Sequence, residues 1–504
     1  MSRRWRQLPA RLVHGILGAF LLAAASPASA QESWDAVFLA GSKIGYIHTF
    51  VEKVNDRGRE LNRVRVDTVL TFRRLNDTVV TKMIYGTIET PEGEVLRLDT
   101  RTLTSDSEIR VYGDAIRGTM KLIMEGTGQR QEVNIPWSSE VRGPYAAEQS
   151  MARKPMEEGE TRNLKMYIPD LNKVCDITLK AGPIIEVALG DGTRRPLRRI
   201  EQIASLDGKP RPEFNTTMWV DASGQVLKSE TDLLGGMVMY RTTKEGATAP
   251  VGPPSVRFDE IRNTIIKVGK VIPNPDRTRY VKYRVTLRDE DPRDVIPTDR
   301  RQRLEPTAER NSAFLIVETS GPGDGPPDPP EVDPQYLRPN GMITSGDERI
   351  QRLARQAVGN AADPWERAVR ISRWVYQNIK NKNFETTFAP ASEVARNLSG
   401  DCTEHSVLAA AMSRAVGIPA RVAVGLIYVD NDRERLKGFG FHMWHEVFVN
   451  QRWVALDASF DQNGVDAVHI KLAEASLEGV SPFEAFLPIL RVQGKLEIDP
   501  LEFR

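Results

Sequence analysis

The hydrophobic period of this chain changes from two to helical spacing after residue 330, and that change constrains its fold more than any other feature. From Ser33 to about Ala249, apolar and polar residues alternate, and turn-forming residues separate the runs. After a segment rich in proline and glycine, residues 321–330, apolar residues recur at helical spacing. A period of two is typical of strands, and a period of 3.6 is typical of helices. We therefore predict a multidomain protein with a mostly antiparallel β region, a small middle β segment and a C-terminal α+β domain.

The same patterns give the expected boundaries. The 69 basic and 68 acidic side chains nearly balance, so no electrostatic feature favours a nucleic-acid partner. We predict an antiparallel β domain over 31–250, a small β domain over 251–320, a linker over 321–334, and a C-terminal domain over 335–504 with a core near 346–469 and a C-terminal extension.

The first thirty residues have the composition of an export signal. Four arginines between Arg3 and Arg11 precede a short apolar run, and Ala28-Ser29-Ala30 offers a cleavage site. The run is too short to span a bilayer. We expect residues 1–30 to be removed as a signal peptide, leaving a periplasmic or secreted protein without a membrane span.

Three helices are predicted in the first part of the C-terminal domain. The first covers about 345–358. Asp363 caps the second, with Pro364 at its first position and Glu366 at capping-box spacing. A short third helix covers about 391–398.

Cys402 is the strongest candidate for chemistry. Asp401 and Glu404 have capping-box spacing, which places Cys402 in the first turn of a helix. Unpaired N–H groups and the positive end of the helix dipole favour a thiolate there and can hold an oxyanion. Residues 407–412 are strongly apolar, so this helix is expected to be buried, and Gly417 ends it.

The only other cysteine, Cys175, lies in a segment with a strand pattern. We predict a small buried strand residue rather than a disulfide partner of Cys402, since a disulfide would consume the candidate nucleophile.

A histidine and a carboxylate follow Cys402 on two predicted strands, 441–449 and 453–460, joined by a turn at 450–452. If the turn has three residues, His445 directly opposes Asp457. A two-residue turn would put these two side chains on opposite faces. We predict that His445 is the general base and Asp457 its orienting carboxylate, which requires the three-residue register.

Two other histidines compete for the base role. His442 lies three positions from His445 along a strand and so faces the other way, which favours a structural or rim position. His405 lies three residues after Cys402 and could approach it. We expect His405, together with Trp444 and Asp401, to support the site.

Cys402, His405, His442 and His445 also imitate a four-ligand zinc pattern. Two histidines three apart on a strand cannot readily converge on one ion. We therefore expect neither a metal nor a cofactor.

Four linked segments resemble the bacterial transglutaminase-like core: 400–405 (GDCTEH), 414–422 (RAVGIPARV), 444–447 (WHEV) and 453–457 (WVALD). By this resemblance Cys402 is the nucleophile, His445 the general base and acid, and Asp457 the orienting residue, on a papain-like fold. The family includes transglutaminases, amidases, peptidases and proteins with no known reaction. The long exported β region is also similar to that of other secreted bacterial members.

The residues and the resemblance together predict an exported cysteine enzyme that acts on amide bonds through a thioester. Peptides, protein glutamine and cell-wall peptides are the expected substrates, by hydrolysis or by transfer to an amine. The alternative is a non-catalytic binding or assembly protein of the cell envelope whose β domains are the working surface.

Overall fold

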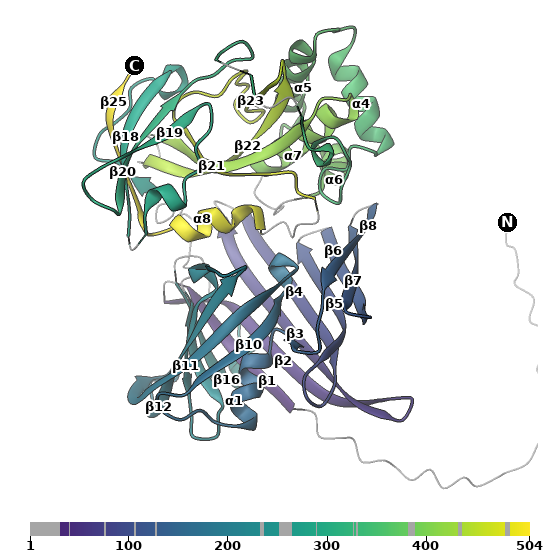
Figure 1. Cartoon of the computed structure of the whole chain (residues 1–504), viewed down its shortest axis with the longest axis vertical. Helices are drawn as coiled ribbons and strands as arrows, with labels where there is room; N and C mark the ends of the chain where they lie inside the picture. Colours follow the sequence, from purple (N-terminus) through teal and green to yellow (C-terminus); the bar gives the residue numbers. More distant parts are fainter. Residues whose placement is uncertain are drawn as a thin grey trace, which may run out of the picture.

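The structure, a computed structural model, has two lobes joined at a narrow junction (Figure 1). The predicted signal peptide, residues 1–30, and the start of the predicted middle domain, 251–264, lie outside the described residues. Within the described ranges, no helix combines the length and the apolarity needed to cross a bilayer. The structure describes residues 31–39, 41–74, 77–104, 107–126, 129–231, 236–250, 265–288, 290–325, 327–328, 331–381, 389–431, 436–478 and 484–504.

The lower lobe is one strongly curved 16-stranded sheet, which confirms the predicted antiparallel β region (Figure 1). The strands pair antiparallel with their neighbours, except β9 and β10, which run parallel. Sheet order is β8-β7-β6-β5-β4-β3-β2-β1-β16-β15-β14-β12-β11-β10-β9, and β13 pairs with β12. The strands are β1 Gln31–Leu39, β2 Ser42–Asp56, β3 Arg59–Arg74, β4 Asp77–Glu89, β5 Val95–Thr104, β6 Ser107–Ile116, β7 Thr119–Gly126, β8 Gln129–Pro136, β9 Val141–Arg142, β10 Thr161–Ile168, β11 Lys173–Ala188, β12 Arg194–Leu206, β13 Lys209–Pro210, β14 Thr216–Val220, β15 Val226–Thr231 and β16 Met237–Thr242.

Two helices belong to this lobe, α1 (Ala146–Arg153) and α2 (Lys244–Thr248). Met151 of α1 packs into the same buried cluster as Cys175 of β11. Cys175 is fully buried, and burial raises the pKa of its thiol to about 11. Cys175 is therefore a small strand residue of the core, as predicted.

The upper lobe contains two further sheets. The five-stranded sheet has the order β17-β22-β21-β24, with β23 paired to β22, and the four-stranded sheet has the order β19-β20-β18-β25. The strands are β17 Ile266–Lys267, β18 Tyr280–Leu287, β19 Gln302–Pro306, β20 Ser312–Glu318, β21 Ala420–Asn431, β22 Leu436–Val449, β23 Arg452–Leu456, β24 His469–Ala475 and β25 Leu496–Phe503.

The four-stranded sheet does not stand apart as the predicted middle domain. Strand β18 pairs with β20 on one side and with the C-terminal strand β25 on the other. Its buried residues, among them Val281 and Tyr283, lie in one hydrophobic cluster with the helices and the five-stranded sheet. The two sheets and the helices of the upper lobe therefore share one main core, because a sheet this small cannot bury its apolar face without the neighbouring helices.

The described residues of the predicted linker contact the upper lobe. Asp328 accepts a hydrogen bond from the backbone N–H of Trp453 at 3.0 Å and pairs with Arg300 at 2.7 Å. Arg452 donates to the carbonyls of Asp324 and Gly325. These contacts hold the linker along β23.

The predicted helices all form in this lobe, and the two with predicted caps, at Asp363 and Asp401, begin where those caps predict. Asp347 accepts from two N–H groups of the first turn of α4, and Asp363 accepts from Glu366 N–H at the start of α5. The helices are α4 Glu348–Val358, α5 Pro364–Asn378, α6 Ala391–Asn397, α7 Cys402–Ala415 and α8 Leu487–Val492.

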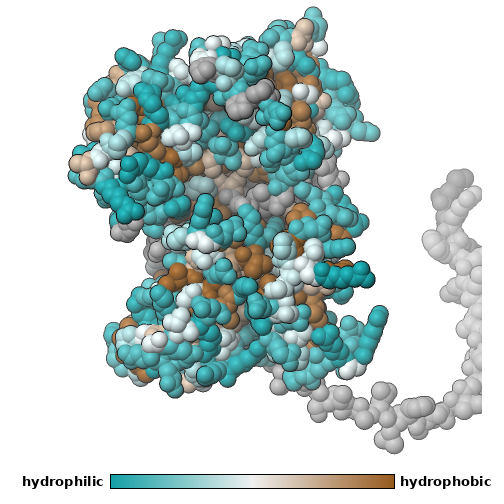
Figure 2. All heavy atoms as spheres, in the orientation of Figure 1, coloured by the Kyte–Doolittle hydropathy of each residue, from teal (hydrophilic) through white to brown (hydrophobic). Residues whose placement is uncertain are grey.

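Helix α8 lies at the junction of the lobes (Figure 1). Leu487 and Leu490 pack against the core of the lower lobe, whereas Ile489 and Val492 pack against the core of the upper lobe. Most of the face seen in Figure 2 is hydrophilic, and its hydrophobic residues gather most densely near this junction. A short helix that is apolar on two sides thus joins the lobes.

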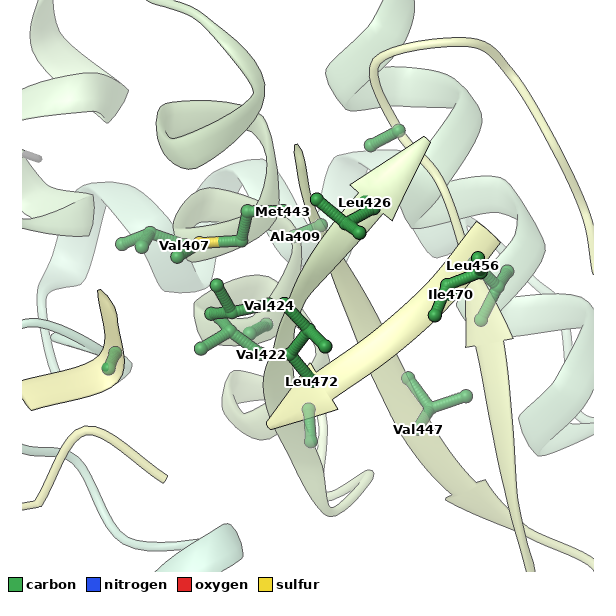
Figure 3. Packing of buried hydrophobic residues seen from close by; sticks show 14 of the residues in the cluster. Val407, Ala409, Val422, Val424, Leu426, Met443, Val447, Leu456, Ile470 and Leu472 are labelled. Atoms are coloured by element: carbon green, nitrogen blue, oxygen red, sulfur yellow. The ribbon is translucent and has the colours of Figure 1, made fainter. Parts of the chain in front are cut away.

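Alternation along the five-stranded sheet separates its side chains into two sets. One set packs with α7 in the main core and includes Val422 and Val424 of β21 and Met443 and Val447 of β22 (Figure 3). The other set includes Ala423, Trp444 and Ala455, which form a small cluster of their own. The residues of a strand that share a face are two apart, so this division decides which polar side chains can meet.

A buried ion network on the second face ties β24 to its neighbours. The side chain of Lys471 of β24 is 2% exposed and pairs with Glu446 of β22 at 3.2 Å, and with Asp299. Arg421 of β21 pairs with the same Glu446 at 2.8 Å. The burial of Glu446 would raise its pKa, but Lys471 and Arg421 lower it to about 2.

Lys471→Met should destabilise the upper lobe by about 3 kcal/mol, since it removes the cation paired with Asp299 and one of the two cations that neutralise the buried Glu446. Urea unfolding followed by tryptophan fluorescence measures this loss. Lys53→Met is the matched control, because Lys53 is 59% exposed and its pair with Glu60 lies in water. Equal unfolding midpoints for the two variants would contradict a stabilising role of the network.

Candidate active site

The first turn of α7 places Cys402 as predicted. Asp401 is the N-cap, its side chain accepts from Thr403 N–H at 2.8 Å, and Glu404 completes the capping box. Cys402 is the first residue of the helix, is half-buried and has a free thiol. The cap occupies the N–H groups of Thr403 and Glu404 and leaves the Cys402 N–H outside the cap.

The hairpin between β22 and β23 does not have the predicted register. Val449 pairs with Arg452, so the turn has two residues, Asn450 and Gln451. Both have positive φ, 52° and 57°, which is the backbone that a type I′ hairpin turn requires. His445 consequently pairs with Leu456, and the prediction that it directly opposes Asp457 is wrong.

This register brings His442, rather than His445, to Asp457. Shifting the pairing by one residue moves every side chain to the other face, so Asp457 shares a face with the even-numbered residues of β22. His442 Nε2 donates to Asp457 Oδ2 at 2.6 Å, and a hydrogen bond also joins His442 to the Cys402 side chain. The structure thus joins cysteine, histidine and aspartate, with a different histidine from the predicted one.

His445 lies on the face that packs into the core. It is fully buried, and among the described residues neither of its ring nitrogens has a hydrogen-bond partner. Burial lowers the pKa of its imidazole to about 4, despite the nearby charges of Asp457 and Glu446. His445 is therefore a neutral core residue near neutral pH.

Charge at the site follows from this geometry. Burial alone would lower the pKa of His442, but Asp457 and Cys402 more than offset it and raise the pKa to about 9. Burial alone would raise the pKa of Asp457, but His442 and His469 hold it well below its usual range. The protonated imidazole and the ionised carboxylate therefore stabilise each other near neutral pH.

The predicted supporting residues lie around this group. The Trp444 ring stacks beside His442 with 6.2 Å between ring centroids. His405 Nδ1 donates to the carbonyl of Asp401 at 2.6 Å within its own helix, and Asp401 caps that helix. Trp444 thus contacts the site directly, whereas His405 and Asp401 belong to the start of α7.

Two residues at the site were not predicted. His469 of β24 contacts Asp457 Oδ2 through Nε2 at 3.2 Å. Phe460 is 54% exposed, and its ring lies 5.4 Å from that of His442. The nearest signal in the sequence for His469 is the three-residue spacing from Asp466, to which its Nδ1 bonds at 2.6 Å.

The zinc pattern seen in the sequence does not gather in space. The only group of potential ligands that the described residues bring together is His442, Asp457 and His469, with ligand atoms within 4.8 Å of one another. The 2.6 Å contact between His442 and Asp457 is a direct hydrogen bond and is too short for two ligands of one ion.

Residues 351–458, which include Cys402, His442 and Asp457, match the profile of the Transglutaminase-like superfamily. No curated protein matches the sequence significantly. Among solved structures, a candidate cysteine protease from Cytophaga hutchinsonii matches with 14% identity over 45% of this chain and 89% of its own, at a TM-score of 0.30.

Two other solved structures each match less than half of the chain. The periplasmic domain of TgpA from Pseudomonas aeruginosa has 14% identity over 40% of this chain and 93% of its own, at a TM-score of 0.26. A β-barrel-like protein of a domain family of unknown function, DUF1849, from Brucella abortus has 13% identity over 44% of this chain and 98% of its own, at a TM-score of 0.32. At these TM-scores we draw no functional conclusion from the likenesses. The profile match agrees with the helix, hairpin and side chains described above. The upper lobe therefore contains a domain of the transglutaminase-like superfamily over residues 351–458.

Proposed function

We propose that this protein is a cysteine enzyme that acts on amide bonds through a thioester on Cys402, with His442 as general base and acid and Asp457 as the orienting carboxylate. The observation that carries the proposal is the position of His442, which is hydrogen-bonded to Asp457 on one side and to Cys402 on the other. Since Nε2 binds Asp457, Nδ1 is the nitrogen left for the sulfur. Such a chain of contacts activates a nucleophile.

The reaction proceeds in two acyl transfers. The Cys402 thiolate attacks the amide carbon, a C–S bond forms and the carbonyl electrons move to oxygen. When this intermediate collapses, the C–N bond breaks and His442 gives its proton to the departing amine. Water or a second amine then attacks the thioester, loses a proton to His442 and releases the thiolate. The Cys402 N–H, which the helix cap leaves unused, is the proposed donor to the oxyanion.

Peptides, protein glutamine and cell-wall peptides are the proposed substrates, since these carry amide bonds outside the cytoplasm, and we propose that the protein is exported. The exposed Phe460 beside His442 gives the site an apolar rim. Whether water or an amine reaches the thioester decides between hydrolysis and transfer.

A second candidate is a non-catalytic envelope protein in which the β lobe is the working surface. A cavity of about 320 Å³ beside α1 favours a ligand-binding role for that lobe, since Arg142, Arg153, Lys154 and Arg162 line it together with Glu160. The two candidates differ in what they require of Cys402, because only the enzyme needs a reactive thiol.

The native protein should therefore be alkylated at Cys402 at pH 6, where a free thiol is almost unreactive. His442→Gln should lower this rate roughly 10²-fold, because the thiolate loses its imidazolium partner. Mass spectrometry of the labelled peptide measures the rate. Wild-type labelling no faster than that of a free cysteine peptide would favour the binding protein.

His445→Leu is the matched histidine variant, and it should keep both alkylation and turnover within a few-fold of wild type. In contrast, His442→Gln should lower turnover by about 10³-fold, and Cys402→Ala should abolish it. Release of ammonia or of amine from glutamine donors, peptides and cell-wall peptides, with and without an added amine, measures turnover. Loss of turnover in His445→Leu with an unchanged fold would overturn the assignment of His442.

His445 should also make folding stability depend on pH. Its pKa is about 4 in the folded protein against 6.5 for the ordinary group. Because the folded value is the lower one, the unfolded chain binds a proton between these pH values that the folded protein does not. Stability should fall as pH drops through this window, by about 3 kcal/mol in all. His445→Leu should remove this part of the loss, measured as the difference between urea unfolding free energies at pH 7 and pH 4.5. Equal pH dependence in the two proteins would contradict it.

A further inference from the structure

His469 lies between two carboxylates, one of which is Asp457 of the candidate active site. Its Nε2 contacts Asp457 Oδ2 at 3.2 Å, and its Nδ1 contacts Asp466 Oδ1 at 2.6 Å. The side chains of His469 and Asp457 are completely buried, and that of Asp466 is 6% exposed. The two contacts engage both nitrogens of one ring, so they determine which protons the ring carries.

An ionised carboxylate can only accept hydrogen bonds, and a neutral imidazole can donate only one. Asp457 also accepts from His442 and from the Ser459 N–H at 2.7 Å. Asp466 also accepts from the Val468 N–H at 3.2 Å and from Gln462 Nε2 at 2.8 Å. Each oxygen of the two carboxylates thus accepts from an N–H donor, so neither carboxylate has an oxygen left to donate to His469. For His469 to donate to both, it must be an imidazolium.

We propose that His469 is a positioning residue of the reaction proposed above: as a buried cation between Asp457 and Asp466, it orients Asp457 and sets the pH at which His442 gives up its proton. The effect on the reaction rests on the proposed function, whereas the positive charge of His469 does not.

The other groups around His469 are two aromatic rings and one cation. Besides the two carboxylates, its ring lies 5.6 Å from that of His442 and 5.4 Å from that of Trp444. Arg301, a buried cation from the segment before β19, donates to the backbone carbonyls of Asp466 and His469.

Two further titratable groups lie close by without a bond to the ring. The hydroxyl of Tyr283 donates to the carbonyl of Ala467 at 3.0 Å. Lys471, two residues along β24, pairs with Glu446 and Asp299 instead. The two carboxylates are therefore the counter-charges in direct contact with the His469 ring.

The effect on His442 follows from the sign of this charge. Asp457 attracts the proton of His442, whereas a cation on the far side of the same carboxylate oxygen repels it. Removing the charge of His469 while keeping a donor to Asp457 should leave His442 protonated to a higher pH, by roughly one pH unit. If His469 only filled space, replacing it would leave the titration of His442 unchanged.

The test is NMR of the protein labelled with ¹⁵N-histidine, which has six histidines in all. His469 should show both ring nitrogens protonated from pH 6 to pH 9. In His469→Gln, whose amide still donates to Asp457, the titration of His442 should move upward by roughly one pH unit. Asp466→Asn should move it in the same direction, because His469 then loses the carboxylate that holds its second proton. His48→Gln, in the lower lobe, serves for assignment and should leave the titration unchanged.

A His469 ring that carries one proton across this pH range, or a His442 titration that does not move in His469→Gln, would overturn the inference. The measurement needs no substrate, so it stands apart from the proposed function. An unshifted titration with full turnover would reject only the role of His469. A shifted titration without turnover on any amide would reject only the enzyme.

Discussion

A carboxylate with no contact to water determines much of this structure. Asp457 is completely buried, and a buried charge is stable only when donors or cations surround it. The structure supplies the ring of His442, the ring of His469 and the backbone N–H of Ser459. These donors come from β22, from β24 and from the turn after β23, so the carboxylate holds three parts of the chain in one arrangement. Cys402 completes the group from the start of α7.

The two-residue turn at Asn450 and Gln451 decides which histidine takes part. Side chains alternate between the two faces of a strand. One more residue in the turn would therefore move each side chain of β23 to the opposite face of the sheet relative to those of β22. The observed turn sends His442 to Asp457 and leaves His445 in the core beside Met443 and Val447, whose packing Figure 3 shows. The site therefore depends on the backbone conformation of a turn that lies eight residues after His442 and six residues before Asp457. His445 remains a buried neutral ring, so the folding stability is expected to fall at low pH.

The remainder of the upper lobe supports this arrangement. Lys471 and Arg421 neutralise Glu446 on the same face of the sheet, and β25, from the far end of the chain, completes the sheet that begins with β18. Helix α8 joins this lobe to the large curved sheet below. The curved sheet has a separate charged cavity beside α1, which the proposed reaction does not use.

Local patterns in the sequence determined much of this. The capping residues Asp363 and Asp401 placed the starts of α5 and α7, and with them Cys402, because a cap acts within one turn of its own helix. Period-two alternation likewise predicted the large antiparallel sheet. Only the tertiary structure decided that His442 rather than His445 meets Asp457, that His469 joins them, and that β25 pairs with β18. These contacts depend on hairpin register and on strands distant in the chain. An alternating pattern shows which residues of a strand share a face. It does not show which of the two faces meets a given neighbouring side chain.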